Sequence, residues 1–571
     1  MEDQLKALRE ISGFLESQGY ETVLVDAPNP FLFVDIIVSG YEFRLKCIFP
    51  KAFPHVFPEI YVMNVFLREF PFLPHIQYVN KELSYVCNFD SNISFPNPQK
   101  PNEVVFECIK RTEKIVEEGI SRKNLEDFSD EFGSYWSSYN AANIKCYSLI
   151  SNTGEPQELL YYLEDSNNRS SLKFYVCDKY YLDNFIDWLS LKLNRKVMKE
   201  EFNKALYLPL IAFEYPPYPI NNLEIYKLMM KQPEFNRYNS YLKKTHGLIL
   251  VLFPLKVCDS NNLFGWLHYP IIKNYQGFRK GKVSPKVSML WKQSKREILR
   301  FRTDVLNQDR LFYRGGNGLK VPSMRVSVTG CGSVGSFLIQ SLVQLGISEV
   351  SIIDKEYLTS ENIARHICGA EDLELEKTEA IKNKLIRHYP YLKLDSHCFD
   401  LWDDLGRAIK IYEEQDCNFI VVGNMSIENK LVEMFNNKEI LKPMVILWVE
   451  PFLLGGHAII LQSPMKDLSQ IYNHKFSFVN KVLENGDKYI RKESGCESTF
   501  IPYSALEIQM FILSFLDYFN ENFIQSKEKG NYLFSWGGKL SWARQNSYAL
   551  TTKWLGKKDR SIIIKKLDEQ L

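Results

Sequence analysis

The sequence predicts a multidomain protein of the α/β class. Its length of 571 residues exceeds what one domain usually holds. Strand-like and helix-like segments alternate along most of the chain. A short apolar strand over residues 326–329 is followed by a glycine turn, a helix over 336–345 and a second strand over 350–353. This order of strand, glycine turn, helix and strand indicates a nucleotide-binding fold.

Composition excludes several other classes of protein. The 70 basic residues nearly equal the 69 acidic ones, so bulk charge gives no reason to expect a nucleic-acid surface. No apolar run approaches membrane-spanning length, and the opening MEDQLKALRE is a charged helix rather than a signal peptide. The 11 cysteines include no Cys-x-x-Cys pair, which argues against a disulfide framework and a zinc site of the usual spacing. We therefore expect a cytoplasmic protein without a nucleic-acid or membrane partner.

Residues 1–142 are expected to form the first domain. Its apolar periodicity predicts an opening helix, strands over 31–38 and 41–47, a proline-punctuated stretch over 49–58, an irregular segment over 70–102 and a helix over 104–119. The irregular segment contains His75 and Cys87. Irregular segments with Asn and Asp nearby are poor places for an inert thiol, so Cys87 is a candidate nucleophile.

This order of elements resembles the ubiquitin-conjugating enzyme fold, which is an α+β fold, and the resemblance implies that Cys87 carries an acyl group as a thioester. The His-Pro-Asn tripeptide of that family is absent, and Pro74-His75-Ile76 stands nearby. The oxyanion-stabilising asparagine is therefore unassigned, with Asn80 and Asn88 as candidates by proximity. The alternatives are a buried structural thiol at Cys87 and a structural hydrogen-bond donor at His75.

Residues 143–300 are expected to form an α/β linker domain, because they contain no catalytic constellation. The patterns predict strands over 173–176 and 247–253 and helices over 182–193 and 223–230. Residues 124–136 are expected to close the first domain. Residues 286–302 are expected to form a basic helix whose charge is a solvated face rather than a binding patch.

Residues 301–571 are expected to form the third domain, in which Gly330, Gly332 and Gly335 make the glycine turn. Glycines let the backbone approach a phosphate closely, and the helix amino terminus offers free N–H groups to the anion. Asp354 ends the second strand, where an acid accepts hydrogen bonds from a ribose. These residues alone fit an NAD site as well as an ATP site.

Asn362, Arg365 and Lys377 distinguish between these two sites. The transition state of carboxylate adenylation loads negative charge on the α-phosphate and the departing pyrophosphate, which fixed Arg and Lys donors stabilise. The set resembles the ThiF, MoeB and ubiquitin-activating adenylation family over residues 305–525. The resemblance implies a Rossmann-like domain that binds ATP, with Asp354 on the ribose and Asn362, Arg365 and Lys377 on the phosphates. Arg365 and Lys377 are also expected to be catalytic.

Two further expectations come from the same resemblance. The family holds Mg²⁺ with an aspartate at the end of the strand expected over 419–422, but here Gly423 and Asn424 follow. Because a hard cation favours carboxylates, weakened metal binding, a substitute acid and impaired adenylation all stay open. The family also takes an arginine from the partner subunit of a homodimer, and Arg310 and Arg314 are the candidates.

Cys496 precedes an apolar helix expected over 505–519. In the family, a loop at this point carries the thioester cysteine, and the N–H groups of a helix amino terminus stabilise a nearby thiolate. The alternative is a thiol of no consequence near the helix cap. Further strands are expected over 442–457, and residues 526–571 are left unassigned.

A conjugating-type domain followed by an activating-type domain resembles the bacterial fusion enzymes of CBASS anti-phage operons. The resemblance implies that ATP activates the carboxyl terminus of a cGAS-like nucleotidyltransferase, that Cys496 and Cys87 relay it as a thioester, and that an acceptor amine, on a protein or a small molecule, receives it. One alternative is a sulfur-carrier adenylyltransferase for cofactor synthesis, which leaves the first 300 residues without a purpose. The other is a catalytically impaired, nucleotide-binding scaffold.

Overall fold

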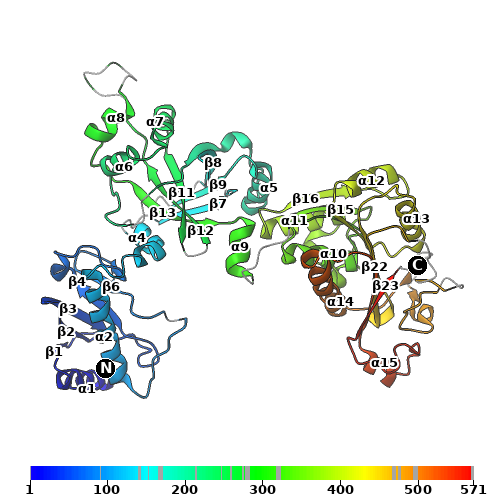
Figure 1. Ribbon diagram of the computed structural model, residues 1–571, viewed down its shortest axis with the longest axis horizontal. Coiled ribbons are helices and arrows are strands. Elements are labelled where there is room, and N and C mark those ends of the chain that lie inside the picture. Colours follow the sequence, from blue (N-terminus) through cyan, green and yellow to red (C-terminus); the bar gives the residue numbers. More distant parts are fainter. Residues whose placement is uncertain are drawn as a thin grey trace. The chain divides into compact units, whose positions relative to one another are not determined.

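The computed structural model describes residues 2–90, 92–138, 143–151, 154–164, 171–211, 215–245, 247–257, 260–272, 276, 279, 283–316, 323–465, 471–473, 477–492 and 499–567. The chain divides into two compact units, and each is described by itself (Figure 1). The first unit consists of residues 1–180 and 200–305, and the second of residues 181–199 and 306–571.

The first unit begins with a six-stranded antiparallel sheet in the order β1-β2-β3-β4-β6-β5. Helices α1 and α2 pack against the sheet face that carries the buried apolar side chains of β2 and β3. Along each strand these residues alternate with less buried ones that point to the other face. The bounds are α1 Glu2–Ser17, β1 Glu21–Val25, β2 Phe31–Val38, β3 Tyr41–Ile48, β4 Glu59–Met63, η1 Asn64–Leu67, β5 Ile76–Tyr78, β6 Leu83–Val86 and α2 Pro101–Ile120. The two predicted helices and the two predicted strands are confirmed.

The segment over 70–102 is not wholly irregular as predicted, because it contains the two short strands β5 and β6. Three and four residues are too few for a period of two to stand out in the sequence. In β6, Ser84 and Val86 are buried on the face that meets the core. The pairing of β5 with β6 brings Cys87 beside His75, since the Cys87 N–H donates to the His75 carbonyl at 2.8 Å.

The second part of this unit is a closed barrel in the strand order β10-β11-β12-β13-β7-β9-β8, with helices inserted between strands (Figure 1). Its bounds are β7 Asn143–Leu149, β8 Gln157–Glu164, β9 Ser171–Cys177, η2 Lys199–Glu201, β10 Asn203–Tyr207, α6 Asn222–Met229, α7 Phe235–Lys244, β11 Ile249–Val257, β12 Ser260–His268, α8 Pro285–Val287, η3 Ser288–Lys292 and β13 Leu299–Val305. The linker therefore contains both strands and helices, as predicted.

One expectation about the linker is wrong, and one about the end of the first domain is incomplete. Residues 286–302 do not form one basic helix, because β13 begins at Leu299 with Phe301 and Thr303 buried and Arg302 and Asp304 exposed, the period of a strand. Residues 124–136 do not simply close the first domain. They form α3 (Asp127–Asp130) and the start of α4 (Phe132–Ser138). Two aromatic side chains of α4 join the barrel core, and one donates to a barrel carbonyl, Trp136 Nε1 to Gly265 O at 3.0 Å.

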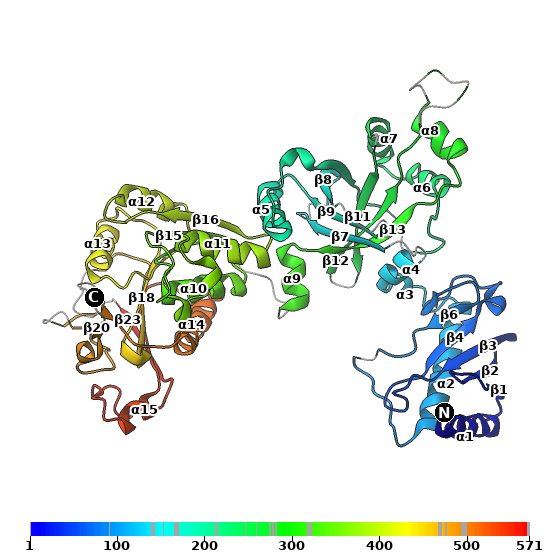
Figure 2. The ribbon, with the colours of Figure 1, turned by 180° about the vertical axis from the view of Figure 1, so that it is seen from behind.

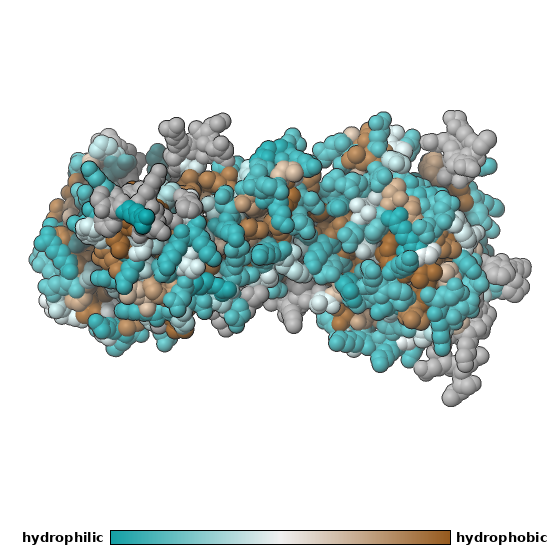
Figure 3. Space-filling view, turned by 90° about the horizontal axis from the view of Figure 1, so that it is seen from above, coloured by the Kyte–Doolittle hydropathy of each residue, from teal (hydrophilic) through white to brown (hydrophobic). Residues whose placement is uncertain are grey.

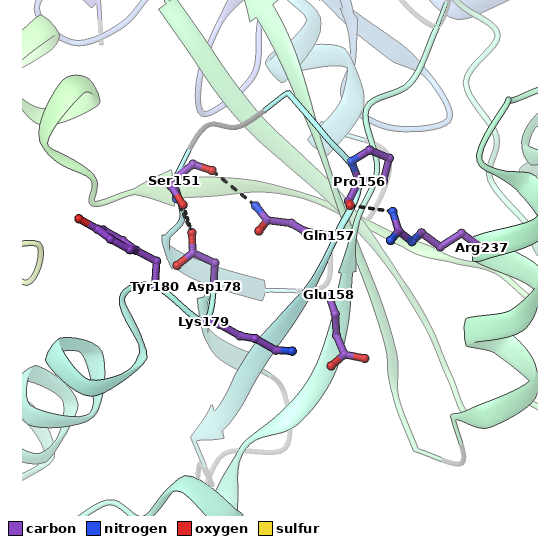
Figure 4. Close-up of a pocket in the computed structure, with 8 residues that line it drawn as sticks. All are labelled: Ser151, Pro156, Gln157, Glu158, Asp178, Lys179, Tyr180 and Arg237. Atoms are coloured by element: carbon purple, nitrogen blue, oxygen red, sulfur yellow. Dashed lines mark hydrogen bonds between the residues drawn. The ribbon is translucent and has the colours of Figure 1, made fainter.

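An open hollow of about 360 Å³ lies where β7 and β9 end and β8 begins (Figure 4). Asp178 is buried at its rim and accepts hydrogen bonds from the backbone and the hydroxyl of Ser151. Arg237 donates to the Pro156 carbonyl at 2.7 Å on the other side. None of the predicted site residues is among the described residues that line this hollow.

The second unit is built on an eight-stranded sheet in the order β16-β15-β14-β17-β18-β19-β22-β23. The first five strands are parallel and the last three are antiparallel to their neighbours. The strands are β14 Arg325–Thr329, β15 Glu349–Asp354, β16 Lys393–Cys398, β17 Cys417–Ile420, β18 Met444–Val449, β19 Gly455–Leu461, β22 Asn531–Gly537 and β23 Ile562–Leu567, and a separate pair is β20 Arg491–Lys492 with β21 Thr499–Phe500. The unassigned residues 526–571 thus supply two strands of the main sheet.

Helices cover both faces of this sheet (Figures 1 and 2). Helices α10, α11 and α14 share one apolar core with it, and α12 and α13 share another on the opposite face. The helices are α5 Leu182–Leu193, α9 Gln308–Gly315, α10 Ser333–Leu345, η4 Ile363–Arg365, η5 Ala370–Asp372, α11 Lys377–His388, α12 Leu405–Glu413, α13 Met425–Asn436, η6 Pro451–Leu453, η8 Gly486–Tyr489, α14 Ala505–Phe519, η9 Asn520–Gln525 and α15 Leu540–Gln545. The predicted nucleotide-binding order of elements over 326–353 is confirmed.

Hydrophilic side chains predominate on the face drawn in Figure 3, with hydrophobic ones in small patches between them. Among the helices in the described part of the chain, none combines the length and apolar character needed to cross a membrane.

Candidate functional site

The candidate site lies at the carboxyl ends of β14, β15 and β17, where a cavity of about 320 Å³ opens. β14 pairs with β15 on one side and with β17 on the other, so the order in which successive strands are added to the sheet reverses at β14. Ligands of parallel α/β sheets bind at such a crevice. The lining includes Gly330, Gly332, Asp354 and Asn424, together with Phe399 and Trp402 from the loop after β16.

The glycines of the turn are required for different reasons. Gly330 has a φ of +97°, and a Cβ there would lie 2.5 Å from the Val421 carbonyl oxygen. A Cβ on Gly335 would overlap the carbonyl oxygen of Gly330, so helix α10 can begin this close to the turn only with glycine. A Cβ on Gly332 would meet no atom within 4 Å. Gly330 and Gly335 therefore shape the turn, whereas Gly332 leaves space on the cavity side.

Asp354 holds the turn from the end of β15. Its Oδ2 accepts the Cys331 N–H at 2.5 Å, and its Oδ1 accepts the Glu356 N–H at 2.7 Å. Burial raises the pKa of Asp354, while these two hydrogen bonds and the charge of Lys377 act against the rise. The carboxyl group thus lies in the wall of the cavity and is oriented by the backbone, as a ribose acceptor would need to be.

His366 is a site residue that the motif comparison did not single out. Its Nδ1 accepts the Cys368 N–H at 3.0 Å, so Nε2 carries the proton and donates to the Cys331 carbonyl at 2.8 Å. Burial lowers the pKa of His366 and keeps the ring neutral. The turn residue Cys331 is therefore held at both its N–H and its carbonyl, and the signal in the sequence is only that a histidine follows Arg365.

The three residues predicted to contact phosphates are not among the described residues that line the cavity. Asn362 Oδ1 accepts from the N–H and hydroxyl of Thr359 within its own turn. The Lys377 side chain is only 4% exposed, and its ammonium pairs with Glu356. Arg365 donates through Nη1 to the carbonyl oxygen of Ile501 at 2.9 Å. Their phosphate contacts stay a prediction.

The residues present do not fit a carboxylate-held Mg²⁺ at the end of β17. Asn424 stands where the metal aspartate was expected, and its Oδ1 caps α13 by accepting from Ser426 N at 3.0 Å and Ile427 N at 3.4 Å. Within the part of the chain that the structure describes, no group of three His, Cys, Asp or Glu side chains could hold a metal ion. The expectation of Mg²⁺ therefore has no ligand set here.

Glu428, one turn into α13, is a carboxyl group that could have taken the place of that aspartate. Glu428 is buried, and burial raises the pKa of its carboxyl group to about 7. Hydrogen bonds from the backbone of Asn424 and Gly423 act in the opposite direction and lower this pKa. Its Oε1 contacts no partner among the described residues. Glu428 accepts hydrogen bonds from the Gly423–Asn424 turn and so supports that turn. Because it is not among the described residues that line the cavity, Glu428 is no substitute ligand for the metal.

The second candidate site surrounds Cys87 in the first unit. The thiol is half-buried at the end of β6. Burial raises the pKa of Cys87, the charges of Glu131 and Asp90 raise it further, and Arg111 opposes them. A raised pKa lowers the fraction of Cys87 present as the nucleophilic thiolate and also makes the thiol a slower leaving group. The other cysteines described in the first unit, Cys47, Cys108, Cys146 and Cys177, are buried.

His75 is a structural residue rather than a base for Cys87. Its Nδ1 lies 2.9 Å from Glu131 Oε1, and its Nε2 lies 3.0 Å from Asp127 Oδ2, so both ring nitrogens are engaged by carboxylates. Its backbone N–H donates to the Tyr135 hydroxyl, which in turn donates to Glu131. The ring therefore fixes the start of β5, and with it the backbone partner of Cys87, to helices α3 and α4.

The two oxyanion candidates have different surroundings. Asn80 Oδ1 accepts from Glu82 N and Leu83 N in the turn before β6. Asn88 is buried, directly follows Cys87 and accepts from the Thr112 hydroxyl of α2 at 3.2 Å. Asn88 is thus held next to the thiol by a helix, and Asn80 is held in a turn of its own.

We expect the stability of this region to depend on pH through His75 and Glu131. The hydrogen bond to Glu131 raises the pKa of His75, although burial of the ring acts to lower it. Burial acts to raise the pKa of Glu131, but its hydrogen bonds to His75 and Tyr135 outweigh burial, so the pKa of Glu131 is lowered. The His75 contribution is complete below about pH 6.5 and is lost as pH rises through its raised pKa. The Glu131 contribution is complete above about pH 4.3 and is lost as pH falls through its lowered pKa.

Hydrogen exchange of residues 127–138 in the full-length protein and in His75→Gln measures this effect. The extra protection of the wild type should be largest near pH 6 and shrink toward pH 9. A difference that stays constant over this range would show that His75 acts without its charge.

The remaining residues predicted from the sequence are Cys496, Arg310 and Arg314. Cys496 lies outside the described residues, which resume at Thr499 in β21. Arg310 and Arg314 lie on α9, one at its third residue and one near its end. Their role across a homodimer stays a prediction.

Two families match parts of this chain. Residues 310–431, which contain the glycine turn, Asp354 and Lys377, match the ThiF family. Residues 29–144, which contain His75 and Cys87, match Prokaryotic E2 family B. The two matched segments are those that hold the two candidate sites.

Individual proteins match shorter parts of the chain. The ATP-dependent ubiquitin transferase-like protein Cap2 of Enterobacter hormaechei subsp. hoffmannii is 27% identical over 241 residues, covering 40% of this chain and 40% of Cap2. The uncharacterized protein y4oA of Sinorhizobium fredii is 33% identical over 86 residues, covering 15% of this chain and 13% of that protein. The chain therefore matches less than half the length of either relative.

Solved structures of two proteins resemble part of the chain. E. coli MccB with ATP is 15% identical and covers 43% of this chain and 65% of its own, with a TM-score of 0.28. PaaA is 16% identical with the same coverage of both chains, and its TM-score is 0.28.

Proposed function

We propose that this chain, which joins a ThiF-family domain to a domain of Prokaryotic E2 family B, is an ATP-dependent ubiquitin-transferase-like enzyme. It activates the terminal carboxylate of a protein and conjugates that terminus to an amine. The observation that carries the proposal is the cavity at the carboxyl ends of β14, β15 and β17, on the same chain as a thiol that β5 and β6 hold in place. A site for ATP and a site for an acyl group are the two parts such a reaction needs.

The first step takes place at the cavity. A carboxylate oxygen attacks the α-phosphorus of ATP, the bond between the α- and β-phosphates breaks, and pyrophosphate leaves. The turn at Gly330 and the amino terminus of α10 offer backbone N–H groups to the phosphates, and Asp354 accepts from the ribose. Arg365 and Lys377 supply the positive charge that stabilises the departing pyrophosphate. The product is an acyl adenylate.

Two thiols then carry the acyl group. The Cys496 thiolate attacks the acyl carbonyl and releases AMP, which forms the first thioester. The Cys87 thiolate attacks that thioester and releases the Cys496 thiolate. An amine finally attacks the Cys87 thioester to form an amide. Each transfer after the first exchanges one activated acyl group for another, so one ATP supports the sequence.

Several finer features belong to the same proposal. The activated protein is a cGAS-like nucleotidyltransferase, and the setting is CBASS anti-phage defence in the cytoplasm; the Cap2 relative supports the class of enzyme. The ThiF-type domain spans residues 301–571, the linker 143–300 and the conjugating domain 1–142. The chain acts as a homodimer, in which Arg310 or Arg314 reaches the partner's site. Mg²⁺ accompanies ATP without a carboxylate at Asn424.

Thioester trapping tests the proposal. The full-length protein is incubated with ATP and a cGAS-like nucleotidyltransferase from the same genome, then separated without reducing agent. The wild type should form thioesters that a thiol releases and an amide-linked conjugate that a thiol does not release. Cys87→Ala should retain a thioester on Cys496 without forming the conjugate, and Cys496→Ala should form neither. Normal conjugates from Cys87→Ala would refute the assignment of that thiol.

Pyrophosphate exchange separates this proposal from its two alternatives. An adenylating enzyme exchanges labelled pyrophosphate into ATP when the carboxylate substrate is present. Absence of exchange, with ATP binding intact, would favour an impaired nucleotide-binding scaffold. Exchange with a sulfur-carrier protein and none with the nucleotidyltransferase would favour cofactor synthesis.

A further inference from the structure

The segment Ile501–Tyr503 contacts Arg365 and Ser333, the first residue of the helix that follows the glycine turn. It follows β21 and precedes α14, and its three residues are partly buried. The Pro502 carbonyl accepts the Phe452 N–H at 2.6 Å, and Tyr503 packs against the core shared by α10 and α14. The segment is therefore fixed to the fold on both sides of its proline.

Tyr503 joins two parts of the site. Its hydroxyl lies 2.8 Å from the Oγ of Ser333, the first residue of α10, whose amino terminus follows the glycine turn. Its ring lies under the guanidinium of Arg365, with 5.0 Å between the Arg365 Cζ and the ring centroid. One aromatic side chain thus connects the helix of the phosphate turn to the arginine expected to bind the phosphates.

The same segment also uses one nitrogen of that arginine, since Arg365 Nη1 donates to the Ile501 carbonyl. A guanidinium has five N–H donors in a fixed plane, so one hydrogen bond and one aromatic face set its orientation and leave the other donors for an anion. Cation–π contact adds attraction without consuming any donor. An unsupported arginine would have to lose the freedom of its long side chain whenever a phosphate binds.

We infer that Tyr503 is a positioning residue for Arg365 in the binding of nucleotide phosphates. The inference rests on the proposed function, because it takes the cavity as an ATP site. The ring orients the guanidinium, and the hydroxyl anchors the ring to Ser333.

Equilibrium titration of the full-length protein with ATP and with adenosine tests this role. Tyr503→Leu should weaken ATP about five- to tenfold, and Tyr503→Phe, which keeps the ring, about twofold. Adenosine has no phosphate, so its affinity should not change. In an Arg365→Gln background, Tyr503→Leu should have no further effect on ATP, because Tyr503 acts through Arg365.

Tyr518→Leu is the matched control, since Tyr518 packs against the same core from α14 and has no contact with Arg365 among the described residues. It should bind ATP as the wild type does. If Tyr503→Leu loses equal affinity for ATP and for adenosine, Tyr503 is only a packing residue. If Tyr503→Leu still weakens ATP binding in the Arg365→Gln background, Tyr503 does not act through Arg365 and the inference is overturned as well. Tighter ATP binding would show that Tyr503 holds Arg365 away from the phosphates.

The wild type separates this inference from the proposed function. If the wild type binds no ATP, the proposed function fails and the inference fails with it. If it binds ATP and the Tyr503 variants match it, only the inference fails.

Discussion

Gly335→Ala is expected to abolish ATP binding, with a loss of affinity of at least about 100-fold, or about 2.7 kcal/mol. The added Cβ would overlap the Gly330 carbonyl oxygen, which is backbone and cannot rotate away. Either the turn or the start of α10 must shift, and overpacking of this kind commonly costs about 1–3 kcal/mol of stability. The turn N–H groups and the helix amino terminus would then no longer converge on one anion.

Two alanine variants control this prediction. Gly332→Ala meets no atom within 4 Å, so it should fold with wild-type stability but still weaken ATP, because its methyl group occupies the cavity side of the turn. Gly556→Ala also meets no atom within 4 Å and lies outside the cavity lining, so it should change neither property. Titration with ATP and thermal unfolding of all three variants provide the measurement. Wild-type ATP affinity in Gly335→Ala would mean that the turn does not hold the phosphates.

The nucleotide fold was predictable because its signals are local. The strand, glycine turn and helix over 326–345 are consecutive, and Asp354 ends the next strand. The strands missed in the sequence had weaker local signals. β6 has only four residues. In β13, Arg300 and Arg302 interrupt the apolar pattern of the strand. β22 lies in a carboxyl-terminal segment that contains no motif. β13 pairs with β7 and β22 pairs with β19, strands that lie far back along the chain, whereas β6 pairs with the nearby β4 and β5 and is missed because it is short.

The candidate site was predictable in its residue types and not in its contacts. The motif named Arg365, but its partners Ile501 and Tyr503 are more than 130 residues away, and no pattern links the two segments. In the first domain, His75 was singled out because it stands near the place of the missing His-Pro-Asn tripeptide, with a structural hydrogen-bond donor as the alternative. Its two carboxylate partners are Asp127, the first residue of α3, and Glu131, which lies between α3 and α4. The sequence did not reveal these two short helices. A local pattern identifies the residues, whereas tertiary packing decides which of their atoms remain available.

Asn424→Asp is expected to lower the Mg²⁺ concentration that half-saturates ATP binding by about tenfold, because a carboxylate replaces a neutral amide at the carboxyl end of β17. Asp caps a helix as well as Asn does, and a negative charge is favourable at a helix amino terminus, so α13 should stay intact.

Asn307→Asp is the matched control for this change, since Asn307 caps α9 through the Arg310 N–H and is not among the described residues that line the cavity. Titration of ATP at a series of Mg²⁺ concentrations compares the two variants with the wild type. A shift in Asn424→Asp alone would mean that this chain binds the metal weakly because its aspartate is missing. If Mg²⁺ dependence is the same in all three proteins, the cation is held by the phosphates and by other residues, and the Asn424 departure has no bearing on adenylation.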